Sequence, residues 1–156
     1  MDLGVAGSIP VAHPICYPAA NQNAVADAAE VANGKLHLVG GAFDTIWTQT
    51  VPFAYPKLSL AMRLLFSAAE LDRKHKVEIR IMNEDGRAIP PSIGGDLEIK
   101  KNPNLPKGWK QGFMTVMNFA NLNFQNFGDY SFELVVDNRN EKSIPLRIAQ
   151  AVGFQS

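Results

Sequence analysis

The sequence predicts an all-β fold: an antiparallel β-sandwich of the immunoglobulin-like or C2-like kind, with roughly eight strands. Residues 130–136 alternate apolar side chains with mostly polar ones, directly after the turn signal Gly128-Asp129, as a strand with one buried face does. The same two-residue period returns at 58–64 and 77–81, and no comparably persistent helical period occurs. Without helices to connect parallel neighbours, the strands are expected to pair antiparallel, and a barrel is the main alternative.

The composition bounds the class of protein. The chain has 156 residues and a hydrophobic content of 46%, which suits a single domain, and we expect this domain to span residues 22–150. Fifteen Lys and Arg residues balance fifteen Asp and Glu residues, so the overall charge argues against nucleic acid or an anionic membrane as a partner. The single cysteine, Cys16, cannot form an intrachain disulfide, and no membrane span or signal peptide is recognisable. A cytoplasmic location is therefore the simplest expectation.

The two ends of the chain are predicted to be tails. Residues 1–21 carry prolines and glycines without a usable period, which is typical of disorder, and residues 151–156 form a short C-terminal tail. Within the first tail, residues 7–10 (Gly-Ser-Ile-Pro) match the conceptual translation of a transfer-RNA T-arm, as if the start codon had been assigned too far upstream. His13 and Cys16 lie in the N-terminal tail, so neither is assigned to a functional site.

The first half of the domain contains a predicted hairpin followed by two further strands. Residues 29–32 lead into Asn33-Gly34, the strongest signal for a two-residue hairpin turn, and Gly40-Gly41 predicts a bulge or a tight bend. Leu36 and Leu38 are expected to point inward. The strands of this half are expected at residues 22–28, 35–39, 42–47 and 58–66, with a proline-containing crossing at 48–57 and a solvated loop at 70–74.

The second half continues with shorter strands and one long loop. Asp85-Gly86 predicts a tight reversal, and residues 102–112 are expected to form a loop long enough to carry a function. The strands of this half are expected at residues 76–82, 97–101, 113–119, 130–136 and 143–148, with 87–91 either pairing or leaving the sheet and a turn at 137–141.

One stretch carries a resemblance to a known family. The segment from Ala26 to Trp47 opens with Asp-Ala-Ala-Glu, continues through Gly-Lys-Leu and reaches a double glycine; a Gly-x-Tyr strand follows at residues 128–130. This pattern is similar to a family of small bacterial proteins of unknown function, and the resemblance covers most of the chain from about residue 22 to residue 150. It implies an intact domain and adds no catalytic residue.

No residue set in the sequence predicts a catalytic or metal centre. His37 is expected on the outward face of a strand without a companion ligand, and His75 follows a charged run that is most simply a solvated loop. No Gly-x-Ser-x-Gly elbow or phosphate-binding glycine loop occurs, and the acidic turns at 84–85 and 137 are too sparse for a calcium site. We therefore expect no catalytic residue, no cofactor and no metal.

Four aromatic residues, Trp47, Phe53, Tyr55 and Trp109, form the candidate contact surface because they fall in or beside irregular segments. The alternative is that they plug the ends of the sandwich. Tyr130 has a purely structural alternative as well, because a tyrosine that enters a late strand can bond its hydroxyl to nearby backbone, as in a tyrosine corner.

The sequence thus predicts an uncharacterised bacterial domain that acts without catalysis as a protein-interaction or accessory module, including self-association through an edge strand. The alternative is a module that binds a small molecule or carbohydrate through Trp47, Tyr55 and Trp109. An enzyme ranks third, because a fold does not dictate function.

Overall fold

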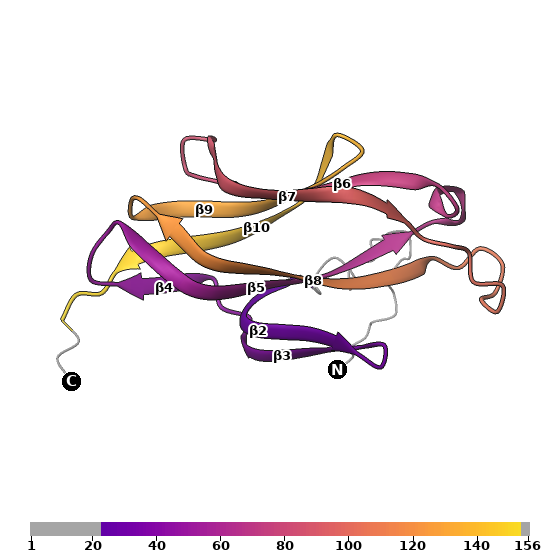
Figure 1. The fold of residues 1–156 in the computed structure, drawn as a ribbon, viewed down its shortest axis with the longest axis horizontal. Helices are drawn as coiled ribbons and strands as arrows, with labels where there is room; N and C mark the ends of the chain where they lie inside the picture. Colours follow the sequence, from indigo (N-terminus) through magenta and orange to yellow (C-terminus); the bar gives the residue numbers. More distant parts are fainter. Residues whose placement is uncertain (1–22, 154–156) are drawn as a thin grey trace, which may run out of the picture.

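The computed structural model describes residues 23–153, and in this part the chain forms nine strands and one short 3-10 turn (Figure 1). The predicted all-β class is confirmed. The predicted N-terminal tail lies outside the described residues, as do residues 154–156 of the C-terminal tail. His13, Cys16 and the start-codon hypothesis belong to the N-terminal tail and therefore lie outside the described residues as well. The elements are β2 (Ala24–Ala32), β3 (Lys35–Gly41), β4 (Thr45–Thr48), β5 (Phe53–Phe66), η1 (Ala68–Glu70), β6 (Lys74–Met82), β7 (Ala88–Glu98), β8 (Gln111–Phe124), β9 (Gly128–Val136) and β10 (Arg139–Gln150).

The strands form two separate sheets, so the described part of the chain is layered rather than closed into a barrel. One sheet has the order β4-β10-β9-β6-β7 and the other the order β3-β2-β5-β8. All neighbours pair antiparallel except β4 and β10, which pair parallel from Thr45 opposite Arg147 to Thr48 opposite Gln150. The wholly antiparallel arrangement that we expected is therefore wrong at this edge. The chain changes sheets after β3, so that β4 approaches β10 from the other layer (Figure 1).

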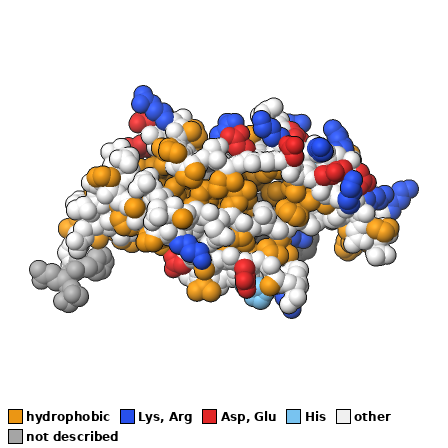
Figure 2. All heavy atoms as spheres, in the orientation of Figure 1, with side chains coloured by type: hydrophobic (Ala, Val, Ile, Leu, Met, Phe, Trp, Pro, Cys, Tyr) orange, Lys and Arg blue, Asp and Glu red, His pale blue; other side chains and the backbone are white. Residues whose placement is uncertain are grey.

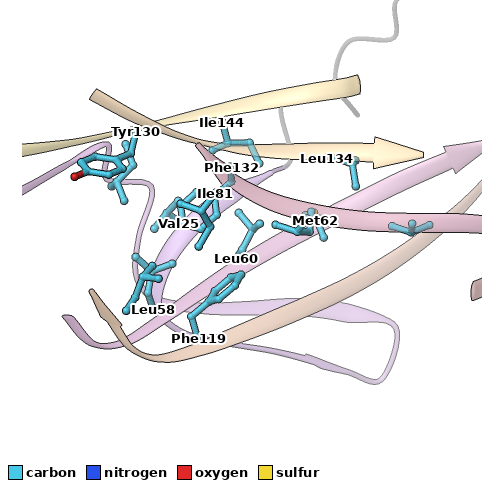
Figure 3. Close-up of a cluster of buried hydrophobic side chains, with 14 of the residues drawn as sticks. Val25, Leu58, Leu60, Met62, Ile81, Phe119, Tyr130, Phe132, Leu134 and Ile144 are labelled. Atoms are coloured by element: carbon cyan, nitrogen blue, oxygen red, sulfur yellow. The ribbon is translucent and has the colours of Figure 1, made fainter. Parts of the chain in front are cut away.

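The core lies between the two sheets, as the alternation in β9 predicts. Tyr130, Phe132 and Leu134 of β9 are buried, and the ring of Phe132 lies 5.6 Å from the ring of Phe119 in β8 of the facing sheet. Figure 3 shows side chains from both layers meeting in this cluster. The largest fully buried side chains are those of Phe124, Phe132, Leu58, Leu60, Met62, Ile79, Ile81, Leu122, Leu146, Ile148 and Val25. In the described part of the chain, no helix is long and apolar enough to cross a membrane.

β5 and β8 are longer than predicted because both change their buried face at the same place. On β8, Phe119 and Leu122 are both buried although three positions separate them, and Asn121 between them has a φ of 50°. On β5, the half-buried Tyr55 and the buried Leu58 show the same spacing, while the register holds Leu122 opposite Tyr55 and Phe119 opposite Leu58. The two-residue alternation of apolar side chains breaks at this place in both strands. The sequence therefore did not reveal that β5 begins before residue 58 and that β8 continues past residue 119.

β7 is one continuous edge strand, not the two separate segments predicted at 87–91 and 97–101. It pairs only with β6, and the register shifts between Ile79 and Ile81, which lie opposite Ile93 and Ile89. The irregular stretch of β7 contains Pro90-Pro91. Prolines are tolerated there because an edge strand needs hydrogen bonds on one side only, and a bulge removes some of these as well.

The predicted turn between β2 and β3 is confirmed. Asn33 and Gly34 have φ angles of 51° and 69°, the positive values that a two-residue turn of type I′ requires. β2 pairs with β5 only from Ala24 to Ala26, after which β2 and β3 continue as a two-stranded ribbon that leaves the sheet (Figure 1). We call residues 27–40 the hairpin arm.

A proline helps to explain why the arm separates from the sheet. Ala26 lies opposite Ser59, so continuing this register would bring Ala29 opposite Pro56, which has no N–H to donate. The inward orientation predicted for Leu38 is wrong, because the arm extends past the core and leaves this side chain 40% exposed. Gly40 has a φ of 60° and the β2–β3 register passes it without a shift, so the glycine pair marks a bend rather than a bulge.

Candidate functional site

The hairpin arm exposes three large apolar side chains. Val31 and Leu38 are each 40% exposed and Val39 is 68% exposed, and they make up half of the six large apolar residues that are exposed among the described residues. Val31 pairs with Leu36 and Ala29 pairs with Leu38, so all four side chains share one face of the ribbon, and Val39 lies on the other. A ribbon with apolar groups on both faces presents a contact surface that the other elements of residues 23–153 do not cover.

A polar contact fixes the base of the arm. The Tyr55 hydroxyl of β5 donates to Oδ1 of Asp27 in β2 at 2.6 Å. Partial burial, the hydrogen bond and the negative charge of Asp27 together raise the pKa of Tyr55 to about 12. A Cβ at Gly40 would collide with the Asp27 carboxylate, so a glycine is needed where β3 passes this contact. The arm therefore leaves the sheet in a defined direction.

The four predicted aromatic residues do not share one surface. Phe53 and Tyr55 pack against the core, and their ring centroids lie 6.1 Å apart. Trp47 on edge strand β4 and Trp109 in the loop between β7 and β8 are 62% and 63% exposed. Figure 1 shows β4 at one end of the molecule and the β7–β8 loop at the other. A single ligand site that contains Trp47, Tyr55 and Trp109 is therefore absent from the described part of the chain.

Trp109 instead lines a hollow of its own, with a volume of about 580 Å³. Its lining includes the buried Leu71, the loop residue Leu105 and the lysines Lys101 and Lys107. The loop is braced by Gln111, whose side chain accepts from the Asn102 N–H at 2.9 Å and donates to the Lys100 carbonyl at 2.7 Å. The predicted loop at 102–112 is confirmed for residues 102–110, whereas Gln111 and Gly112 already belong to β8. The sequence did not show that Leu71 lines the hollow beside this loop.

A second cleft, of about 280 Å³, lies beside His75. The residue was expected in a solvated loop, yet it belongs to β6 and is only 5% exposed, because Phe66 covers its ring at 5.4 Å. The charged residues that line this cleft are Arg63, Glu70, His75, Lys110, Glu141 and Lys142.

Both ring nitrogens of His75 face acceptors. Nδ1 lies 2.7 Å from Oδ2 of Asp137, and Nε2 lies 2.7 Å from the backbone carbonyl of Glu70. These two acceptors, the carbonyl first, outweigh burial and raise the pKa of His75. The His75 hydrogen bond and the Lys76 N–H lower the pKa of Asp137. A general base needs a free nitrogen, and here both are engaged, so the geometry assigns His75 to holding the η1 turn and the β9–β10 turn together.

A third apolar surface lies between the edge strands β7 and β8, where Figure 2 shows hydrophobic side chains in the middle of the face. The partly buried apolar residues of β7 and β8 that pack against the core are Ile89, Ile93, Leu97, Phe113 and Met117. Across residues 23–153, no three His, Cys, Asp or Glu side chains are grouped in a way that could hold a metal ion.

Comparison with known proteins places the chain in a family. A family model described as "Family of unknown function (DUF6941)" matches residues 21–149 of the 156. Neither the curated proteins nor the solved structures contain a match. The resemblance to a family of unknown function, predicted from the segment between Ala26 and Trp47, is confirmed. The chain belongs to the DUF6941 family.

Proposed function

We propose that this chain is a non-enzymatic protein-interaction module whose contact surface is the hairpin arm. The supporting observation is the exposure of Val31, Leu38 and Val39 on a ribbon that the rest of the domain leaves uncovered. Each square ångström of apolar surface removed from water contributes about 25 cal/mol, so covering these side chains favours association. The outer edge of β3 adds hydrogen-bonding groups that have no partner strand within residues 23–153.

The strand order supports an immunoglobulin-like sandwich as the scaffold of this module. In such a fold the strands A, B and E lie in one sheet and G, F, C and C′ in the other. β2, β5 and β8 fit the first set, and β10, β9, β6 and β7 fit the second in the same order. The Tyr130 hydroxyl donates to the Asn126 carbonyl at 2.9 Å where β8 leads into β9, the position of a tyrosine corner between strands E and F. β3 has no counterpart in this scheme, so the arm is an addition to the scaffold.

The composition favours a protein partner in the cytoplasm. Equal numbers of basic and acidic residues give the chain no net charge to attract nucleic acid. The single cysteine leaves the chain without any intrachain disulfide that an oxidising compartment would have to maintain.

A photo-crosslinking experiment tests the proposed surface. Benzoylphenylalanine is placed at Val39 in the full chain, and at Trp109 as a control of similar exposure, 68% against 63%. After irradiation in an extract of the native host, we expect discrete protein adducts from position 39, which the additional change Leu38→Lys removes. The proposal would be contradicted if only the probe at position 109 gave adducts. It would also be contradicted if the probe at position 39 gave no adduct, either in the extract or with the pure chain alone.

The Trp109 hollow favours a second candidate function, the binding of a small molecule or carbohydrate. An exposed indole beside an apolar floor offers a stacking surface for a flat ring, and Lys101 and Lys107 offer donors at the lining. A ligand screen by thermal shift tests this function. Trp109→Ala should abolish the rise in Tm given by a hit, whereas Trp47→Ala, which removes an equally exposed indole elsewhere, should leave that rise unchanged.

A further inference from the structure

We infer that the partner of the hairpin arm is a second copy of this chain, joined through antiparallel pairing of the two β3 strands about a two-fold axis at Leu38. This inference rests on the proposed function of the arm. It specifies which backbone groups pair, which side chains meet and which position lies on the axis.

The turn determines which groups of β3 face outward. In a two-residue hairpin, the residues that flank the turn exchange hydrogen bonds, and here these are Ala32 and Lys35. Because bonded and non-bonded pairs alternate, His37 and Val39 also direct their N–H and C=O groups toward β2. The N–H and C=O groups of Leu36 and Leu38 therefore point to the outer edge. Gly40, with a φ of 60°, bends the strand, so Leu38 is the last regular outward residue before this bend.

The outward residues are compatible with their own copy when the axis passes through Leu38. Leu38 then lies opposite Leu38 of the second copy, and Leu36 lies opposite Gly40, which has no side chain to collide with it. Lys35 lies opposite Gly41, so the ammonium groups of the two copies do not face each other. An axis at His37 would instead place the two polar imidazole side chains opposite each other.

The same pairing brings apolar side chains of the two copies side by side on one face of the joined sheet. Val31, Leu36 and Leu38 share one face of each arm, so two arms bring six of these side chains into one continuous stripe. An isolated two-stranded ribbon is marginal in water, whereas four paired strands with an apolar face form a stable sheet. The edge strand β7 is a poorer candidate, because its Pro90-Pro91 interrupts the row of donors.

A cysteine crosslink tests the axis position. In the full chain carrying Cys16→Ser, the variant Leu38→Cys places the two thiols at the axis, with a Cα separation of about 5.5 Å that a disulfide can span. Val31→Cys is the matched control, because Val31 is also 40% exposed and lies on the same face, but on β2, one strand farther from the axis in each copy. Under mild oxidation we expect the Leu38→Cys variant to be recovered mostly as a linked dimer and the Val31→Cys variant to remain single.

Sedimentation of the native chain provides the second readout. We expect the mass to double with rising concentration, and Leu38→Lys to remain monomeric with an unchanged circular dichroism spectrum. Ala88→Lys, which adds the same charge at the exposed start of edge strand β7, should associate like the native chain.

The inference would be overturned by a native chain that stays monomeric with Leu38→Cys unlinked, by equal linkage from Val31→Cys, or by a Val39 photoprobe that reacts with residues 1–22 of its own chain. Photoprobe adducts with a different protein would also overturn it, yet they would support the proposed function, so the two failures can be told apart.

Discussion

His75 and Asp137 lie 62 positions apart in the sequence, and their side chains meet at 2.7 Å between Nδ1 and Oδ2. The register of β6 and β9 places Val77 opposite Val136, so Asp137 comes opposite Lys76, the residue next to His75. The contact joins the start of β6 to the β9–β10 turn.

The first prediction follows from the protonation of this pair. Folding raises the pKa of His75 above its ordinary value of 6.5, so the stabilisation is fully present below that pH and is lost as the pH rises through the folded-state pKa. Folding lowers the pKa of Asp137 below 3.8, so its contribution is present above that pH and is lost as the pH falls through the folded-state pKa. In urea unfolding at pH 5.5, the native chain should therefore have a larger free energy of unfolding than His75→Gln. This difference should narrow by about 1 kcal/mol toward pH 9.

The variant Asp137→Asn serves as the control for this experiment. Asparagine tolerates the φ of 48° at this position and can still accept from the Lys76 N–H, but it removes the charge beside His75. The difference in the free energy of unfolding between Asp137→Asn and the double variant Asp137→Asn/His75→Gln should also narrow as the pH rises. This narrowing should occur at a lower pH than in the native background. A difference that stays constant from pH 5.5 to pH 9 in the native background would contradict the assignment.

The second prediction concerns the Tyr130 hydroxyl. It donates to the Asn126 carbonyl at 2.9 Å, while the ring packs edge-on against Phe124 with 5.0 Å between centroids. Tyr130→Phe keeps the ring and should cost about 1 kcal/mol, because it removes the partly buried hydrogen bond between the Tyr130 hydroxyl and the Asn126 backbone. Denaturant unfolding measures the change. Tyr55→Phe is the comparison, since its hydroxyl bonds the exposed Asp27 carboxylate, which water can solvate instead, and equal costs would argue against a special role for Tyr130.

The third prediction tests the centre of the core. Phe132 is fully buried and meets Phe119 of the facing sheet, so Phe132→Ala should destabilise the domain by about 3–5 kcal/mol through lost burial and the cavity it leaves. Trp47→Ala removes a larger ring that is 62% exposed and should change stability by less than about 0.5 kcal/mol. Comparable effects of the two changes in urea unfolding would contradict the burial of Phe132.

The fourth prediction concerns the turn of the arm. Gly34 has a φ of 69° and no atom within 4 Å of where a Cβ would stand, so Gly34→Ala adds only backbone strain of about 1 kcal/mol. Hydrogen exchange should become faster at the amides of His37 and Val39 and stay unchanged in β9. Faster exchange throughout the domain would show that the arm is not an independent unit of stability.

Local patterns predicted most of the strands correctly. In β9 the alternation of Tyr130, Phe132 and Leu134 corresponds directly to the buried face, and at Asn33-Gly34 the turn type follows from residues that tolerate positive φ. These features depend on near neighbours in the sequence. β7 was divided in two because Pro90-Pro91 ends most strands, and only the edge position, a property of the whole sheet, permits it.

The candidate sites depended on contacts that local patterns do not contain. His75 looked like part of a charged loop because its partner Asp137 comes from another strand pair, and the depth of the Trp109 hollow depends on Leu71 from a distant turn. Leu38 follows the alternation of a buried strand, yet no strand of residues 23–153 covers it where β2 leaves β5. Trp47 and Trp109 likewise do not share a surface, because they lie at opposite ends of the molecule, which local patterns do not reveal.

The parallel pairing of β4 with β10 has a consequence for synthesis. β10 lies between β4 and β9 in the sheet order but follows every other described strand in the chain, so β4 remains without a neighbour until the ribosome has delivered residues 147–150. The four-stranded layer, by contrast, has all its members once β8 is made. We expect a nascent chain that is stalled before β10 to hold one assembled layer over an incomplete one, with the edge of β9 that pairs with β10 open to chaperones.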